Sequence, residues 1–111
     1  MKHSYKIVTY SAIALGIIHL AFTLFFDRFT LNTLWFIGSG FAIIFAGFLN
    51  LAFIRFPMQD SIVRTLCIIA NLASTILFVV ALLTVLQEPQ VFIGILIFAL
   101  LTVFSILLRS E

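Results

Sequence analysis

Residues 33–54 read TLWFIGSGFAIIFAGFLNLAFI, 22 consecutive positions without a charged side chain. A helix needs about 20 apolar residues to cross the roughly 30 Å of membrane hydrocarbon, whereas a strand of a membrane barrel needs only about ten residues in alternation. Lipid also tolerates only a backbone that satisfies its own hydrogen bonds, and a single long apolar segment does so as a helix. This stretch is therefore predicted to be a transmembrane helix.

Three further apolar stretches, at 7–26, 62–86 and 91–108, repeat this pattern along the 111-residue chain. The composition agrees, because 64% of the residues are hydrophobic and only 9% are charged, against about 25% charged residues in soluble domains. We predict an all-α integral membrane protein in which residues 1–111 form a single domain of four transmembrane helices. The short loops between the stretches predict an up-down-up-down four-helix bundle.

The connections contain residues that commonly begin helices. We expect Asn32 to cap the second helix and Asp60-Ser61 to supply the N-cap of the third, with Arg64 one turn later to pair with Asp60. Pro89 is expected at an early position of the fourth helix, where its missing N–H is harmless. The first apolar run is longer than a signal peptide allows and has no small-residue cleavage site, so we expect this segment to be retained.

The basic residues predict the orientation in the membrane. If the N-terminus is cytoplasmic, only Arg28 falls outside, and the other basic residues all fall inside: Lys2, Lys6, Arg55, Arg64 and Arg109. An excess of Lys and Arg marks the cytoplasmic side. We therefore predict a multi-pass protein of the cell (inner) membrane with both termini in the cytoplasm. Tyr5 is expected at the inner interface and Trp35 at the outer one, where polar-tipped aromatic rings prefer to lie.

Polar side chains inside the spans indicate where a binding site would lie. From a rise of about 1.5 Å per residue, His19 lies about 18 Å from the cytoplasmic ends of the spans, level with Ser74 and Thr75. Asn71 and Asn50 lie nearer to those ends and lean toward each other, because helical side chains point toward their own N-terminus. We predict a polar column with these five residues as ligand-binding candidates. The structural alternative is that they are hydrogen-bonding contacts between helices.

Small residues predict where the helices approach each other closely. The first span carries Ala12 and Gly16. The second carries a row at every fourth position: Gly38, Ala42, Ala46 and Asn50. The fourth span is bulkier and mostly apolar, so we expect it to face lipid or a partner, either another copy of the chain or a different membrane protein.

His19 is the ionisable residue nearest to the middle of the membrane, which makes it a functional candidate. The alternative is a neutral imidazole bonded to Ser74 or Thr75. Zinc would need three or four ligands, and the other histidine, His3, lies at the terminus. A haem shared between two copies would depend on His19 alone. We predict no metal site, no cofactor and no catalytic residue.

In length and number of spans the chain resembles the small multidrug resistance transporters. Those proteins depend on a membrane-embedded glutamate in the first helix, where this chain has His19 as its ionisable group. The resemblance implies a small proton-linked transporter in which His19 replaces the carboxylate as the protonation switch. No carboxylate lies within the four apolar stretches, which argues against an ion-coupled pump.

Three functions follow from these residues. The favoured one is a small binding or accessory protein that holds a lipid-like or small apolar ligand within the helix bundle. The others are the His19 transporter and a structural subunit that docks through the fourth helix on a larger membrane complex. An enzyme is not expected, because no nucleophile–base pair or carboxylate pair can be assembled. Nucleic-acid binding is disfavoured by a net charge of only +2 with scattered basic residues. The lipid bilayer is the expected partner.

Overall fold

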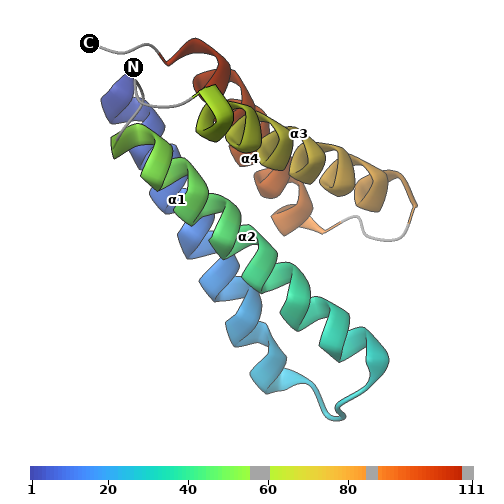
Figure 1. Cartoon of the computed structure of the whole chain (residues 1–111). Helices are drawn as coiled ribbons and strands as arrows, with labels where there is room; N and C mark the ends of the chain where they lie inside the picture. The colour runs from blue at the N-terminus through green and yellow to red at the C-terminus, as the bar shows by residue number, and fades with distance from the viewer. Residues whose placement is uncertain (56–60, 85–87, 109–111) are drawn as a thin grey trace.

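The computed structural model describes residues 1–55, 61–84 and 88–108, and these residues form four long helices in sequence (Figure 1). The elements are α1 (Lys2–Ala21), the short 3₁₀ helix η1 (Phe22–Phe25), α2 (Leu31–Arg55), α3 (Ser61–Thr84) and α4 (Pro89–Leu107). Each long helix lies in one of the predicted apolar stretches, with η1 continuing the first stretch beyond α1. Each of the four resulting spans is long and apolar enough to cross a membrane. The chain is therefore an all-α, multi-pass membrane protein, as predicted.

The helices pair into two hairpins that meet at one end of the molecule (Figure 1). The first hairpin is formed by α1 and α2, and the second by α3 and α4. The hairpins meet where α1 and α3 begin and where α2 and α4 end, and they diverge toward their other ends. We call the shared end the basic end, because it carries Lys2, Lys6, Arg55 and Arg64. The up-down-up-down bundle is thus confirmed, with close association of all four helices at the basic end.

The start of α2 differs from the prediction. The backbone N–H of Thr33 donates to Oγ1 of Thr30 at 3.2 Å, and the N–H of Thr30 donates to Oγ1 of Thr33 at 3.2 Å. The helix begins at Leu31, so Asn32 lies inside its first turn and the predicted cap at Asn32 is wrong. Two threonines three residues apart satisfy the exposed backbone donors reciprocally, which a single asparagine cannot do.

The predictions for the remaining two connections concern the starts of α3 and α4. Pro89 lies in the first turn of α4, directly after the N-cap residue Glu88, and this prediction is confirmed. Asp60, part of the predicted Asp60-Ser61 cap, lies outside the described residues, and α3 begins at Ser61. The predicted pairing of Asp60 with Arg64 therefore lies outside the described residues as well.

Close packing of α1 against α2 depends on glycine. A Cβ atom on Gly16 would lie 2.6 Å from the side chain of Ile44 and 3.0 Å from the carbonyl oxygen of Gly40. A Cβ atom on Gly47 would lie 2.5 Å from the side chain of Ile13. All three distances are shorter than van der Waals contact, so the two backbones can approach this closely only without side chains at these positions.

The small-residue row predicted on the second span only partly faces its neighbour. Ala46 and Asn50 are buried, but Gly38 and Ala42 are exposed, and a Cβ atom on Gly38 would meet nothing within 4 Å. The contacting face of α2 is instead the one that carries Gly40 and Gly47. The row with a spacing of four drifts around the helix, because an α-helix has 3.6 residues per turn.

Burial differs between the helices. In the most apolar 18-residue windows, 39% of α2, 28% of α4 and 11% of α3 is buried. Large apolar side chains such as Leu24 and Leu83 are more than three-quarters exposed. In hydrocarbon this is an ordinary helix surface, because lipid tails solvate it. The fourth helix contributes more to the interior than we predicted, and α3 is the helix most open to its surroundings.

Candidate functional site

Four polar side chains, one from each long helix, meet at the centre of the basic end. They are Tyr5 of α1, Asn50 of α2, Asn71 of α3 and Ser105 of α4, and each is completely buried. We call these four residues the polar cluster. Tyr5 and Ser105 lie in the first turn of α1 and the last turn of α4, whereas Asn50 and Asn71 lie further inside α2 and α3.

The centre of the polar cluster is a reciprocal pair of amides. Nδ2 of Asn50 donates to Oδ1 of Asn71 at 2.7 Å, and Nδ2 of Asn71 donates to Oδ1 of Asn50 at 2.7 Å. The sequence predicted that these two residues converge, and the structure confirms this contact. Because the two hydrogen bonds run in opposite directions, they fix both the spacing of α2 and α3 and the rotation of each helix about its axis.

Tyr5 and Ser105 connect this pair to the outer helices. The hydroxyl of Tyr5 donates to Oδ1 of Asn50 at 2.6 Å. Nδ2 of Asn71 also lies 3.2 Å from the carbonyl oxygen of Leu101 and 3.3 Å from Oγ of Ser105, which accept from it. A continuous chain of hydrogen bonds therefore joins all four helices.

The polar cluster is close to saturated. The two hydrogens of the Asn50 amide are used by Oδ1 of Asn71 and by the carbonyl oxygen of Ala46 at 2.7 Å. The two lone pairs of its oxygen are used by Tyr5 and by Nδ2 of Asn71. In the described part of the chain, no buried side-chain nitrogen or oxygen lacks a partner. A ligand at this position would have to displace existing hydrogen bonds, so the cluster is suited to joining helices. The ligand-binding role of Asn50 and Asn71 stays a prediction.

Arg64 of α3 contacts the end of α4 and an aromatic ring of α2. Its Nη1 donates to the carbonyl oxygens of Ser105 at 3.1 Å and of Ile106 at 3.2 Å, in the last turn of α4. The last carbonyl groups of a helix have no partner within the helix and carry partial negative charge, so a cation is stabilised there. The guanidinium carbon also lies 5.1 Å from the ring centre of Phe53 on α2. Arg64 thus bridges three helices.

His19 lies away from the polar cluster and packs against α2. Its Nε2 lies 3.0 Å from the carbonyl oxygen of Phe36, and its ring stacks on the Phe36 ring with centroids 3.6 Å apart and planes 12° apart. A Cβ atom on Gly40 would lie 3.2 Å from Cδ2 of the imidazole, so the ring fits closely against the helix. His19 therefore contributes to packing within the first hairpin.

The other predicted site residues lie on α3. The hydroxyl of Thr75 donates to the carbonyl oxygen of Asn71 at 2.8 Å, within its own helix, and Ser74 is half-buried. The bond predicted between His19 and these hydroxyls is replaced by the bond to Phe36, because the hairpins diverge at this depth. The predicted column is thus divided: Asn50 and Asn71 meet, whereas His19 lies in the other hairpin from Ser74 and Thr75.

Two members of the polar cluster were not predicted. We expected Tyr5 at the membrane interface, but it is completely buried, with its ring 5.5 Å from Phe104 and 6.4 Å from Phe53. A signal for this burial exists in the sequence. Tyr5 lies on one stripe of α1 with three other buried residues: Thr9, Ala12 and Gly16. For Ser105, the only signal is a depth similar to that of Asn50, since both residues lie close to the cytoplasmic ends of their predicted spans.

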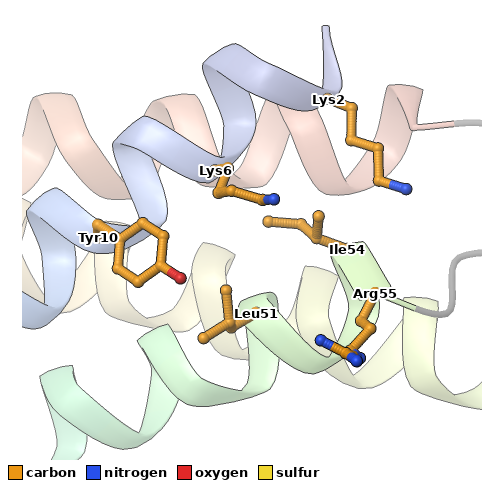
Figure 2. Close-up of a pocket in the computed structure, with 6 residues that line it drawn as sticks. All are labelled: Lys2, Lys6, Tyr10, Leu51, Ile54 and Arg55. Carbon is orange, nitrogen blue, oxygen red and sulfur yellow. The ribbon is translucent and has the colours of Figure 1, made fainter.

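A cavity of about 230 Å³ lies between α1 and α2, on the outer side of the basic end (Figure 2). It is lined by Lys2, Lys6, Tyr10, Leu51, Ile54 and Arg55. The three α1 residues recur at every fourth position, so they share one face of that helix. The α2 residues lie within one turn, and this face of α2 is directed at the lysines. We call this cavity the α1–α2 cavity.

The lining of the α1–α2 cavity has a polar and an apolar part. Figure 2 shows Lys2 and Lys6 reaching from α1 into the space between the helices, with the hydroxyl of Tyr10 directed into the same space. Ile54 is 1% exposed and closes the inner side, whereas Tyr10 is 53% exposed at the rim. Arg55 extends back along α2 toward Leu51. Cationic groups thus border a cavity whose inner wall is apolar.

Comparison of the chain with protein-family models, with curated proteins and with solved structures gives no match. The described residues also contain no group of three or more His, Cys, Asp or Glu side chains that could hold a metal ion. The single cysteine, Cys67, is buried, and its Sγ lies 3.4 Å from the carbonyl oxygen of Leu49. The function must therefore be inferred from the polar cluster and the α1–α2 cavity themselves.

Proposed function

We propose that this protein is a small membrane-embedded binding protein that holds an amphipathic, lipid-like ligand in the α1–α2 cavity. The observation that carries the proposal is the two-part lining of this cavity, with cationic and hydroxyl groups at the rim and the apolar side chains of Leu51 and Ile54 inside. Ligand sites typically combine an apolar surface with a few convergent polar groups that orient the ligand. The proposed role is binding, without catalysis.

The polar cluster supports this role by holding the cavity walls in place. On both helices, cluster and cavity residues are direct neighbours in the chain: Tyr5 precedes Lys6, and Asn50 precedes Leu51. Hydrogen bonds that fix the rotation of α1 and α2 at Tyr5 and Asn50 therefore also fix the direction in which Lys6 and Leu51 project. We propose the polar cluster as a positioning element for the site.

The proposal also places the basic end at the cytoplasmic face of the cell membrane. Lys2, Lys6, Arg55 and Arg64 all lie at that end, and an excess of basic residues marks the cytoplasmic side. The α1–α2 cavity then lies at the level of the inner headgroups, where a membrane lipid can reach it sideways. This position differs from the interior site near His19 that the sequence favoured.

The test is recovery of a bound lipid with the purified protein. The chain is extracted in a mild detergent and transferred to the gas phase for native mass spectrometry. We expect about one lipid to remain on each wild-type chain. The Leu51→Trp variant, which fills the α1–α2 cavity, is expected to lose it. Leu66→Trp is the matched control, because Leu66 is 49% exposed on α3 and does not line the cavity.

Two results would contradict the proposal. The first is a wild-type chain that carries no lipid under conditions in which the membrane extract itself contains abundant lipid. The second is equal loss of lipid in Leu51→Trp and Leu66→Trp, which would mean that lipids cover the helices without a defined site.

A further inference from the structure

We infer that the α1–α2 cavity selects the phosphate-bearing headgroup of an anionic lipid from the cytoplasmic leaflet. This inference rests on the proposed function and names the chemical class of its ligand. Three basic side chains line the one cavity: Lys2, Lys6 and Arg55. Basic pockets between membrane helices on the cytoplasmic side suit anionic headgroups, since each cation attracts the phosphate.

The distribution of charge in the described residues favours an anion at this position. The carboxylates of Asp27 and Glu88 lie at the opposite end of the molecule, next to the start of α2 and of α4. Arg64 is engaged with the last carbonyl groups of α4. Lys2 and Lys6 therefore face a space into which the described chain sends the Tyr10 hydroxyl but no carboxylate. A phosphate would accept hydrogen bonds from the ammonium groups and from this hydroxyl.

The size of the cavity fits a headgroup better than a whole lipid. Its volume is about 230 Å³, whereas sites that enclose a drug-sized molecule hold roughly 300–1,000 Å³. The acyl chains must then lie outside the cavity. The helix faces that line it continue toward the membrane interior with apolar residues, among them Ile17 on α1 and Phe48 on α2, which are 55% and 50% exposed. This surface offers a path for the chains.

The alternative role of these cations is to anchor and orient the helices at the interface, without selecting a lipid. The two roles differ in what they predict for lipids that have the same phosphodiester but different net charge. Anchoring cations attract anionic lipids as a diffuse layer, whereas a defined site retains one anionic lipid selectively. The experiment therefore compares phosphatidylglycerol with phosphatidylcholine, which has no net charge.

The protein is equilibrated in detergent micelles containing equal amounts of both lipids and analysed by native mass spectrometry. We expect the wild type to retain phosphatidylglycerol over phosphatidylcholine by about 25-fold, because a basic residue near an anionic surface contributes about 1 kcal/mol, or about fivefold, and Lys2 and Lys6 both border the cavity. Lys2→Gln/Lys6→Gln should lower the preference by about 25-fold on the same basis. Lys2→Arg/Lys6→Arg should keep it.

Arg28→Gln is the control for net charge, because it removes a cation at the opposite end of the molecule. This variant should leave the preference unchanged. Inorganic phosphate at millimolar concentration is added in a separate arm, and we expect it not to displace the lipid, since it gains nothing from the apolar surface. Displacement by inorganic phosphate would overturn the inference, because the site would then be one for a soluble anion.

The remaining outcomes separate this inference from the proposed function. One lipid per chain that is retained equally as phosphatidylglycerol or phosphatidylcholine would overturn the headgroup selectivity and leave the binding function standing. An equal loss of preference in Arg28→Gln and in Lys2→Gln/Lys6→Gln would also overturn it, because general charge would then explain the result. A chain without any bound lipid would overturn both.

Discussion

The two ends of this molecule are held together by different interactions. At the basic end, hydrogen bonds between Tyr5, Asn50, Asn71 and Ser105 join all four helices, whereas at the opposite end His19 and Phe36 connect only α1 and α2. The hairpins stay together in the first region and diverge in the second (Figure 1). Apolar side chains gain little by moving from lipid to a helix interface. Buried polar bonds therefore account for where the two hairpins associate, whereas the close packing of α1 on α2 depends on glycine.

The largest loss of stability is expected from removing a central side chain of the polar cluster. Asn50→Leu removes the bonds to Tyr5 and to Asn71 and leaves their polar groups buried without this partner. We expect the free energy of unfolding to fall by about 2–3 kcal/mol, measured by steric trapping in bicelles. Asn32→Leu, an exposed asparagine of the same helix, should change it by less than about 0.5 kcal/mol. Equal effects of the two substitutions would mean that the polar cluster does not hold the helices together.

A loss of stability of similar size is expected from a substitution in the first hairpin, outside the polar cluster. In Gly16→Ile, the new side chain meets Ile44 and the backbone oxygen of Gly40, so α1 and α2 must separate. Overpacking of this kind costs about 1–3 kcal/mol, which the same unfolding assay would detect. Gly38→Ile is the control, because a Cβ atom there meets nothing within 4 Å. If both variants are equally stable, the close helix contact at Gly16 is absent.

A smaller effect is expected for the hydroxyl of Tyr5. Tyr5→Phe keeps the ring packing against Phe53 and Phe104 but removes one donor from Asn50, whose oxygen still accepts from Asn71. We expect a loss of about 0.5–1.5 kcal/mol in the free energy of unfolding. Tyr10→Phe, at a tyrosine that is 53% exposed, should have almost no effect on stability. A loss of the same size in both variants would place Tyr5 at the interface, as the sequence predicted.

The smallest effect is expected at the opposite end. His19→Leu removes one bond to the carbonyl oxygen of Phe36, which we expect to lower the free energy of unfolding by about 0.6 kcal/mol, the average for such bonds in membranes. Distances between spin labels on the two hairpins at the basic end should stay unchanged in this variant. A loss as large as that in Asn50→Leu would show that His19 also holds the hairpins together.

The sequence was sufficient to predict the four helices and one contact between them. The four spans follow from their length and lack of charge, which the membrane constrains strongly. The contact between Asn50 and Asn71 follows from depth, because both residues lie near the basic end, where neighbouring helices are close. That prediction also needed the lean of each side chain toward its own N-terminus, and height alone did not identify Tyr5 or Ser105 as partners.

The contacts of His19 could not be derived in the same way. Its height matches that of Ser74 and Thr75, but height does not specify the angle between hairpins. His19 instead packs against the face of α2 that carries Gly40 and Gly47, within the first hairpin, and spacing alone did not distinguish this face from that of Gly38. The α1–α2 cavity could not be predicted for a related reason: the charges of Lys2 and Lys6 indicate orientation, whereas the cavity depends on the face of α1 that they share and on which face of α2 lies opposite.

The most direct test of the central claim, that a lipid-like ligand is held between α1 and α2 at the basic end, is to map where a lipid binds to the wild-type chain. Phosphatidylglycerol with a photoreactive diazirine on its headgroup is added to the protein in nanodiscs and crosslinked, and the modified peptides are sequenced. Our account predicts that the modified residues lie in segments 2–10 and 51–55. Crosslinks spread evenly over all four helices, or concentrated on α3 and α4, would contradict it.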